Sequence, residues 1–137
     1  MNKQTDQVIY ENIRTALAEA RSKVVSVVNS AMVQVYWEIG CEINEAVGDR
    51  AEYGKQLSKF LSEQLTIEFG KGFDESNLRN MRKFHRTFPI RDALRHELSW
   101  THYRSLMRID ELKRRDFYLT ECADLGWTSR QLVCFQV

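Results

Sequence analysis

Apolar residues recur at helical spacing along the first third of the chain. Their steps of four, four and three residues average about 3.67 residues, close to the repeat of a straight α-helix. The spacing predicts a helix over about residues 5–47, roughly 60 Å long at about 1.5 Å per residue. We name these apolar positions the apolar stripe: Ile9, Ile13, Leu17, Ala20, Val24, Val28, Ala31, Val35 and Ile39.

Such a helix is longer than the remainder of a small chain can cover. Either it folds back near Asn29 and Ser30, where two poor helix formers are adjacent, or it pairs with another chain. We favour a long or kinked helix that supports a homodimer.

The remaining pattern predicts further helices and no strands. Gly48-Asp49-Arg50 ends the first pattern, and apolar residues return at helical spacing from Tyr53 to Phe69. Two glycines follow in FGKGF and predict a turn. A third helix begins after Asp74, a good N-cap residue, and ends before Pro89. The fold class is therefore an all-α multi-helix domain.

Cap signals place three shorter helices near the C-terminus. Ser99 can cap one helix, and residues 110–124 form another that Gly126 ends. Thr128 and Gln131 then form a capping box. Residues 127–137 start a truncated linker helix, or else a short terminal helix that packs locally. We expect one module over residues 1–137, with a long helix or helical pair over 1–47 and a helix-turn-helix-like core over 51–126.

Composition narrows the class of protein. The chain has 137 residues with a single proline and six glycines, too few turn residues for a sandwich or barrel. Its three cysteines, Cys41, Cys122 and Cys134, are widely spaced without a CxxC pair, so we expect neither a disulfide framework nor a metal site. No apolar leader or membrane-length segment is present in the sequence. We expect a cytoplasmic protein with no cofactor, membrane partner or small-molecule substrate.

The net charge of +1 hides two unlike halves. Residues 1–70 carry seven Lys or Arg against ten Asp or Glu, and residues 71–137 carry thirteen against nine. The window of residues 79–108 contains eight basic residues and only two acidic ones, Asp92 and Glu97. This window is the strongest electrostatic feature of the sequence.

The third helix concentrates this charge on one side. At about 100° per residue its apolar positions share one side and four cations share the other. We name the cations the basic strip: Arg79, Arg82, Lys83 and Arg86. Asn77 and Asn80 flank the strip, and Asn and Arg side chains can both read base edges. Arg104 and Arg108 share a face of the next helix and would extend the strip. These eight residues are the predicted nucleic-acid contacts.

Other interpretations compete with this one. The connection over 70–75 is longer than a standard helix-turn-helix turn, so phosphate contact is better supported than base readout. The strip could instead be a solvated face, or could pair with the acidic half in an interaction or oligomerisation domain.

Catalytic interpretations are weaker. The segment HELSWTH is not HExxH, and His85 lies on the apolar side of its helix. Glu111-Leu112-Lys113 with Asp92 upstream could imitate part of a nuclease triad, but that triad needs strands and the flanking periodicity is helical. We therefore predict that the chain has no catalytic residues and is not itself an enzyme.

Several segments resemble the N-terminal domain of the YhcG family of bacterial proteins. They are VYWEIG at 35–40, AEYGKQLSKFLSEQLTIEFGKGF at 51–73, NLRNMRKFHRTFP at 77–89, LSWTHYRSLMRI at 98–109 and RDFYLTECADLGWTSRQL at 115–132. The resemblance implies a helical, helix-turn-helix-like domain that precedes a PD-(D/E)XK nuclease-like domain in full-length members. The sequence ends near the start of that half, so we expect a non-catalytic DNA-targeting module. The resemblance supplies no DNA-contacting residues, and the basic strip rests on helical geometry alone.

Overall fold

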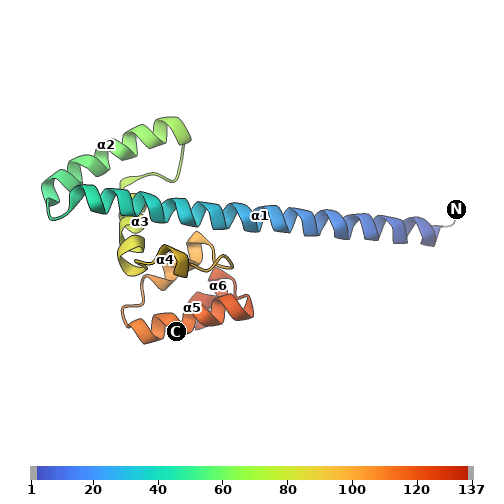
Figure 1. Ribbon diagram of the computed structural model, residues 1–137. Coiled ribbons are helices and arrows are strands. Elements are labelled where there is room, and N and C mark those ends of the chain that lie inside the picture. Colours follow the sequence, from blue (N-terminus) through green and yellow to red (C-terminus); the bar gives the residue numbers. More distant parts are fainter. Residues whose placement is uncertain (1–2, 136–137) are drawn as a thin grey trace.

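The chain folds into helices joined by short connections (Figure 1). The computed structural model describes residues 3–135 and contains no strand among them. The all-α prediction is confirmed. The elements are α1 (Lys3–Val47), α2 (Ala51–Phe69), α3 (Glu75–Thr87), the 3-10 turn η1 (Arg91–Ala93), α4 (Trp100–Leu106), α5 (Leu112–Leu125) and α6 (Ser129–Phe135).

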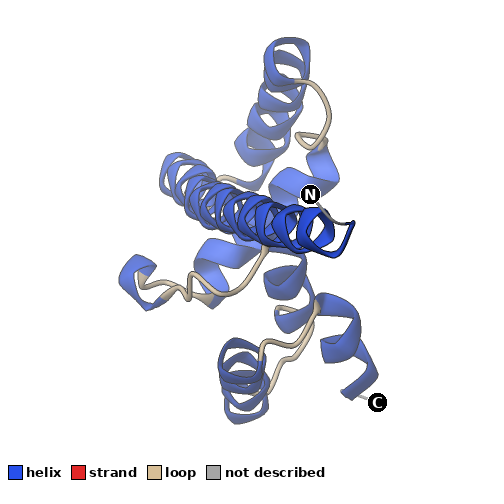
Figure 2. Cartoon of the chain, turned by 90° about the vertical axis from the view of Figure 1, so that its right-hand side faces the viewer, coloured by secondary structure: helices blue, strands red, loops and turns tan. Residues whose placement is uncertain are grey.

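Helix α1 runs through Asn29 and Ser30 without a break, so the chain does not fold back there. Helix α1 has 45 residues and extends past the other helices. Its N-terminal part projects away from them in Figure 1 and points toward the viewer in Figure 2. The first buried residue of α1 is Val33. We refer to the helices from α2 to α6, with the part of α1 that they contact, as the body.

The body packs on a side of α1 that the apolar stripe does not occupy. Within the last turns of α1 the buried residues are Val33, Gly40, Ile43 and Val47. At about 100° per residue these lie on the opposite side of the helix from Ile13, Ala31 and Val35. Only Ile39 among the stripe residues is partly buried. The continuous stripe exists as predicted, but it faces solvent instead of the core.

A close crossing of α1 and α3 organises the first part of the core. Gly40 lies directly against the backbone of α3, where a methyl group would overlap the carbonyl of Met81. Because the two helices approach so closely, Ile43, Val47, Leu78 and Met81 form one buried cluster. Helix α2 covers this cluster through Leu57, Leu61 and Leu65.

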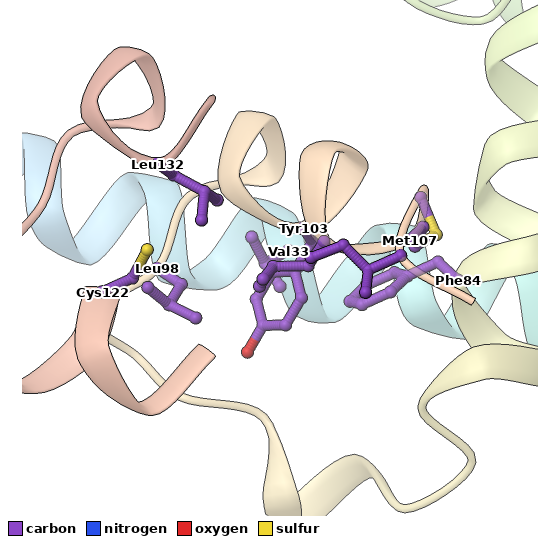
Figure 3. Packing of buried hydrophobic residues seen from close by; sticks show 9 residues of the cluster. Val33, Phe84, Leu98, Tyr103, Met107, Cys122 and Leu132 are labelled. Atoms are coloured by element: carbon purple, nitrogen blue, oxygen red, sulfur yellow. The ribbon is translucent and has the colours of Figure 1, made fainter. Parts of the chain in front are cut away.

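A second cluster joins α3 to the C-terminal helices. Figure 3 shows Tyr103 between Phe84 and Met107 at one end and Leu98, Cys122 and Leu132 at the other. Phe84, Tyr103 and Leu132 are each 0% exposed. The Tyr103 hydroxyl accepts a hydrogen bond of 2.7 Å from the backbone N–H of Arg95. This cluster fixes α4, α5 and α6 against the end of α3.

The predicted caps are present. Asp74 accepts from the backbone N–H of Asn77 at 2.7 Å, and Ser99 forms a capping box with His102. Gly126 ends α5 with a φ of 67°, a left-handed conformation that glycine adopts without strain. Thr128 and Gln131 exchange bonds of 2.8 Å and 3.1 Å at the start of α6. Local sequence therefore sets these helix ends.

Helix α6 packs back on the body. Leu132 is fully buried against α4, and the Tyr118 hydroxyl donates to the carbonyl of Phe135 at 3.0 Å. Ser129–Phe135 therefore packs locally, and the linker helix stays a prediction. The rest of the predicted linker, residues 136–137, lies outside the described residues.

The predicted helix-turn-helix pair corresponds to α2 and α3. Residues 70–74 connect them, and α2 touches α3. Helix α3 nevertheless makes its most extensive contacts with α1. The helix-turn-helix-like geometry, and the division of the chain into one module, stay predictions.

Candidate nucleic-acid interface

The two sides of α3 differ as the pattern predicts. Leu78, Met81 and Phe84 are each 0% exposed. On the opposite side, Arg79, Lys83 and Arg86 are exposed and Arg82 is half-buried. The sequence places four cations together because i, i+3, i+4 and i+7 positions share one side of a helix.

Arg82 is held in place by Asn44 of α1. Its Nε donates to Asn44 Oδ1 at 3.0 Å, and Asn44 Nδ2 donates to the Arg82 carbonyl at 3.0 Å. Burial, followed by the neighbouring Arg86, lowers the pKa of Arg82. A guanidinium stays charged in proteins despite such shifts. Arg82 is therefore a cation with a fixed position.

His85 belongs to the same network and has a structural role. Asn44 Nδ2 lies 3.0 Å from His85 Nδ1, so this ring nitrogen accepts. The Trp37 ring meets the His85 ring edge-on at 5.0 Å, and Trp37 Nε1 donates to the Phe88 carbonyl at 2.7 Å. The interpretation of His85 as a packed histidine agrees with these contacts.

The cations of the basic strip have no acidic partners within residues 3–135. The ion pairs there join Arg14 to Glu11, Arg91 to Glu38, Arg95 to Glu97 and Asp124, and His96 to Glu97. Glu75 lies one turn before Arg79 on the same side of α3, but it forms no ion pair with it. The acidic surplus of the first half does not neutralise the strip within one chain.

The two asparagines beside the strip differ. Asn77 Nδ2 donates to the Gly72 carbonyl, and Asn77 Oδ1 accepts from Trp100 Nε1 at 3.3 Å. Both ends of this amide therefore hold the loop before α3 and the start of α4. Asn80 is half-buried and lines a hollow of about 330 Å³ together with Arg104. The fold thus brings Arg104 beside the two asparagines, and its place among the contacts of the strip stays a prediction.

Arg108 lies in different surroundings. It lines a hollow of about 380 Å³ with Asp110, Glu111 and Arg114 at the start of α5. Two carboxylates beside it weaken the local positive potential. Arg108 is exposed, but its place among the contacts of the strip stays a prediction.

A polar hollow between α2 and α3 contains two residues that sequence reasoning missed. Lys55 and Ser58 line a space of about 300 Å³ with Arg79, Arg82 and Glu75. Gly54 permits this approach, because a Cβ there would lie 3.1 Å from Val47 and 3.7 Å from Arg82 Nη1. A glycine inside a helical pattern signals such close packing, and that signal was available in the sequence.

The candidate catalytic and metal-binding groups of the chain are chiefly its His, Cys, Asp and Glu side chains. Residues 3–135 contain no group of three His, Cys, Asp or Glu side chains that could hold a metal ion. Burial raises the pKa of the Cys122 thiol to about 11, and burial with the nearby Glu45 raises that of Cys41. Both shifts disfavour the reactive thiolate. Glu111 and Lys113 are exposed at the start of α5, a helix and not a strand.

The described residues define an all-α protein in which one helix carries four cations on one side. Among these residues, no helix is apolar and long enough to cross a membrane. The chain matches the model of the DUF1016 N-terminal domain over residues 12–135, and it belongs to this family.

A named relative agrees with this assignment. The chain is 39% identical over 85 residues to an Escherichia coli K12 protein named "Putative nuclease YhcG". The match covers 60% of this chain and 23% of that protein, so the chain spans about a quarter of the relative's length. The predicted resemblance to the YhcG N-terminal domain is confirmed. No solved structure matches the chain.

Proposed function

We propose that this domain binds DNA through the basic strip and positions a nuclease on it, inside the bacterial cytoplasm. The observation that carries the proposal is that four cations on one side of α3 have no acidic partner in the described chain. Like charges at helical spacing repel one another, so a polyanionic ligand would relieve this repulsion. The family's association with a protein named as a nuclease supports DNA as that ligand.

Phosphate contact supplies most of the binding energy in this proposal. The exposed Arg79, Lys83 and Arg86 face solvent with free guanidinium and ammonium groups, while Arg82 offers a fixed one. With four to six phosphate contacts, log K falls against log salt with a slope of about −4 to −5. In this proposal Asn80 and Arg104, which line one hollow, supply a second row of contacts.

The test uses two of the exposed cations. Lys83→Glu with Arg86→Glu should abolish duplex binding in a low-salt mobility shift, because two cations become anions and the charge of the strip falls by four units. Arg82 is left intact, since its bonds to Asn44 support the fold. The matched control is Lys113→Glu with Arg130→Glu, an equal charge change at exposed positions of α5 and α6. Equal binding by both double variants would refute the assignment of the strip.

The cleavage chemistry lies outside this domain in our proposal. The described residues provide no metal-binding cluster, and the Glu111-Leu112-Lys113 segment is helical. Purified chain should therefore not nick DNA when Mg²⁺ or Mn²⁺ is added. Metal-dependent nicking that Glu111→Ala eliminates would show that the chain is an enzyme in its own right.

A second function, protein interaction, is favoured by a different observation. The part of α1 before Val33 has no buried residue among those that the structure describes, and it exposes a row of large apolar residues. A soluble surface seldom carries such a row without a partner. An interaction driven by the acidic and basic halves would weaken in salt, whereas one driven by the apolar stripe would not. Sedimentation at low and high salt separates these two forms of the interaction.

A further inference from the structure

The apolar stripe is exposed along α1, except at Ile39. Its large residues Ile9, Ile13, Leu17, Val24 and Val28 are between 47% and 62% exposed. The body does not cover them, because it packs on another side of α1: the first buried residue of α1 is Val33, and residues 96–99 and His102 line a hollow with Ser22, Val25 and Asn29, which lie off the stripe. Figure 1 shows the N-terminal part of α1 extending past the other helices. Either a partner outside the folded chain covers the stripe, or the stripe remains exposed to water.

The exposed area fits a missing partner of substantial size. The chain exposes 9886 Å², whereas a compact monomer of 16.2 kDa exposes about 7,500 Å². The excess of about 2,400 Å² is well above the roughly 800 Å² per partner that a standard interface buries. The exposed area is therefore large enough for a long helix pair to bury a stable interface.

We propose that a second copy of this chain covers the stripe, with the two α1 helices antiparallel and a two-fold axis near residue 22. This inference names the partner for the interaction function and is independent of DNA binding. The stripe is self-complementary about that point, because each alanine of the stripe faces a larger residue of the other helix. The facing pairs are Ile9 with Val35, Ile13 with Ala31, Leu17 with Val28, and Ala20 with Val24.

Size favours the antiparallel over the parallel orientation. In a parallel pair at equal register, Ala20 would face Ala20 and Ala31 would face Ala31, which leaves gaps in two layers. Close packing requires that small residues meet large ones. The antiparallel register satisfies this requirement along the stripe. In the antiparallel pair the two bodies, with their basic strips, lie at opposite ends of the helix pair.

The first experiment compares two adjacent valines by sedimentation equilibrium. Val24 on the stripe and Val25 off it are 62% and 57% exposed and share one helix. Wild-type chain should be a dimer that persists in high salt. Val24→Asp should raise the dimer dissociation constant at least 100-fold, because two carboxylates enter an apolar interface, and Val25→Asp should raise it less than threefold. A monomeric wild type, or equal effects of the two substitutions, would overturn the proposal.

The second experiment tests orientation by disulfide formation. Cys41→Ser with Cys134→Ser leaves Cys122, which is buried. In that background, a mixture of Ile13→Cys and Ala31→Cys chains should cross-link, and Ile13→Cys chains alone should not. The reverse result would establish a parallel pair and refute the register.

Failure of the two proposals can be told apart. Val24→Asp leaves the basic strip untouched, and Lys83→Glu with Arg86→Glu leaves the stripe untouched. The strip variant should still sediment as a dimer. If the strip variant is a dimer and the wild-type chain does not bind DNA, the DNA-binding proposal is refuted and the dimer proposal is supported.

Discussion

Replacing Gly40 with alanine tests the helix crossing that organises the fold. At an exposed helical position this change stabilises a protein by about 0.5–1 kcal/mol, because glycine loses more backbone entropy on folding. At Gly40 the sign should reverse. The added methyl group would overlap the Met81 carbonyl oxygen and carbon and approach the Arg82 nitrogen. All three are backbone atoms, so no side-chain rotation can relieve the overlap and α3 must shift.

The expected net loss is about 1–2 kcal/mol. Overpacking a close-packed contact costs about 1–3 kcal/mol, and the helix-propensity gain offsets part of that cost. For a chain of this size each kcal/mol corresponds to about 3.5 °C, so Tm should fall by about 4–7 °C. The shift of α3 would also strain the bonds from Asn44 to the Arg82 carbonyl and to His85, which cross the same interface.

The assay is urea and thermal unfolding followed by tryptophan fluorescence. Trp37, Trp100 and Trp127 all pack against the core, so the signal reports on the body and not on the exposed part of α1. The control is Ala46→Gly at an exposed position of the same helix, which should cost about 0.5–1 kcal/mol. If Gly40→Ala matches or exceeds wild-type stability while the control loses stability, the close crossing is refuted.

Three further outcomes are expected. Leu132→Ala should lower the free energy of unfolding in urea by about 2–5 kcal/mol, because Leu132 is 0% exposed even though α6 has only seven residues. A loss below about 1 kcal/mol would contradict the place of Leu132 in the core. Burial raises the pKa of Tyr103 from 10.0 to about 12, so the unfolded chain loses this proton first and stability should fall as pH rises from 10 to 12. Tyr103→Phe should remove that part of the slope, and an unchanged slope would argue against the buried hydroxyl. Native chain should react with a thiol reagent at Cys134 and, more slowly, at Cys41, while Cys122 reacts only after unfolding; prompt reaction of all three would contradict its burial.

The short-range features of the fold followed from neighbouring residues. Asp74, Ser99, Gly126 and Thr128 end or begin helices where the sequence predicts, because capping is a contact between residues within one turn. The amphipathic division of α3 was equally predictable from its period.

The surroundings of the basic strip were harder to predict. Its four cations were identified from helical spacing, but Lys55 and Ser58 come from α2 and share no pattern with them. Asn77 has a side chain committed to Gly72 and Trp100, residues that sequence spacing does not relate to it. Contacts between separate helices depend on how the helices cross, and no local period encodes that angle.

The sequence alone determined that the first third of the chain carries one apolar stripe at helical spacing, because a helical period fixes which residues share a side. Only the tertiary structure decided that α1 runs unbroken through Asn29 and Ser30, and which side of α1 the body occupies. Gly40 permits a close crossing with α3, and that crossing commits Val33, Ile43 and Val47 to the core. The stripe, on the other side, is left exposed because the chain is too short to cover both sides of a 45-residue helix.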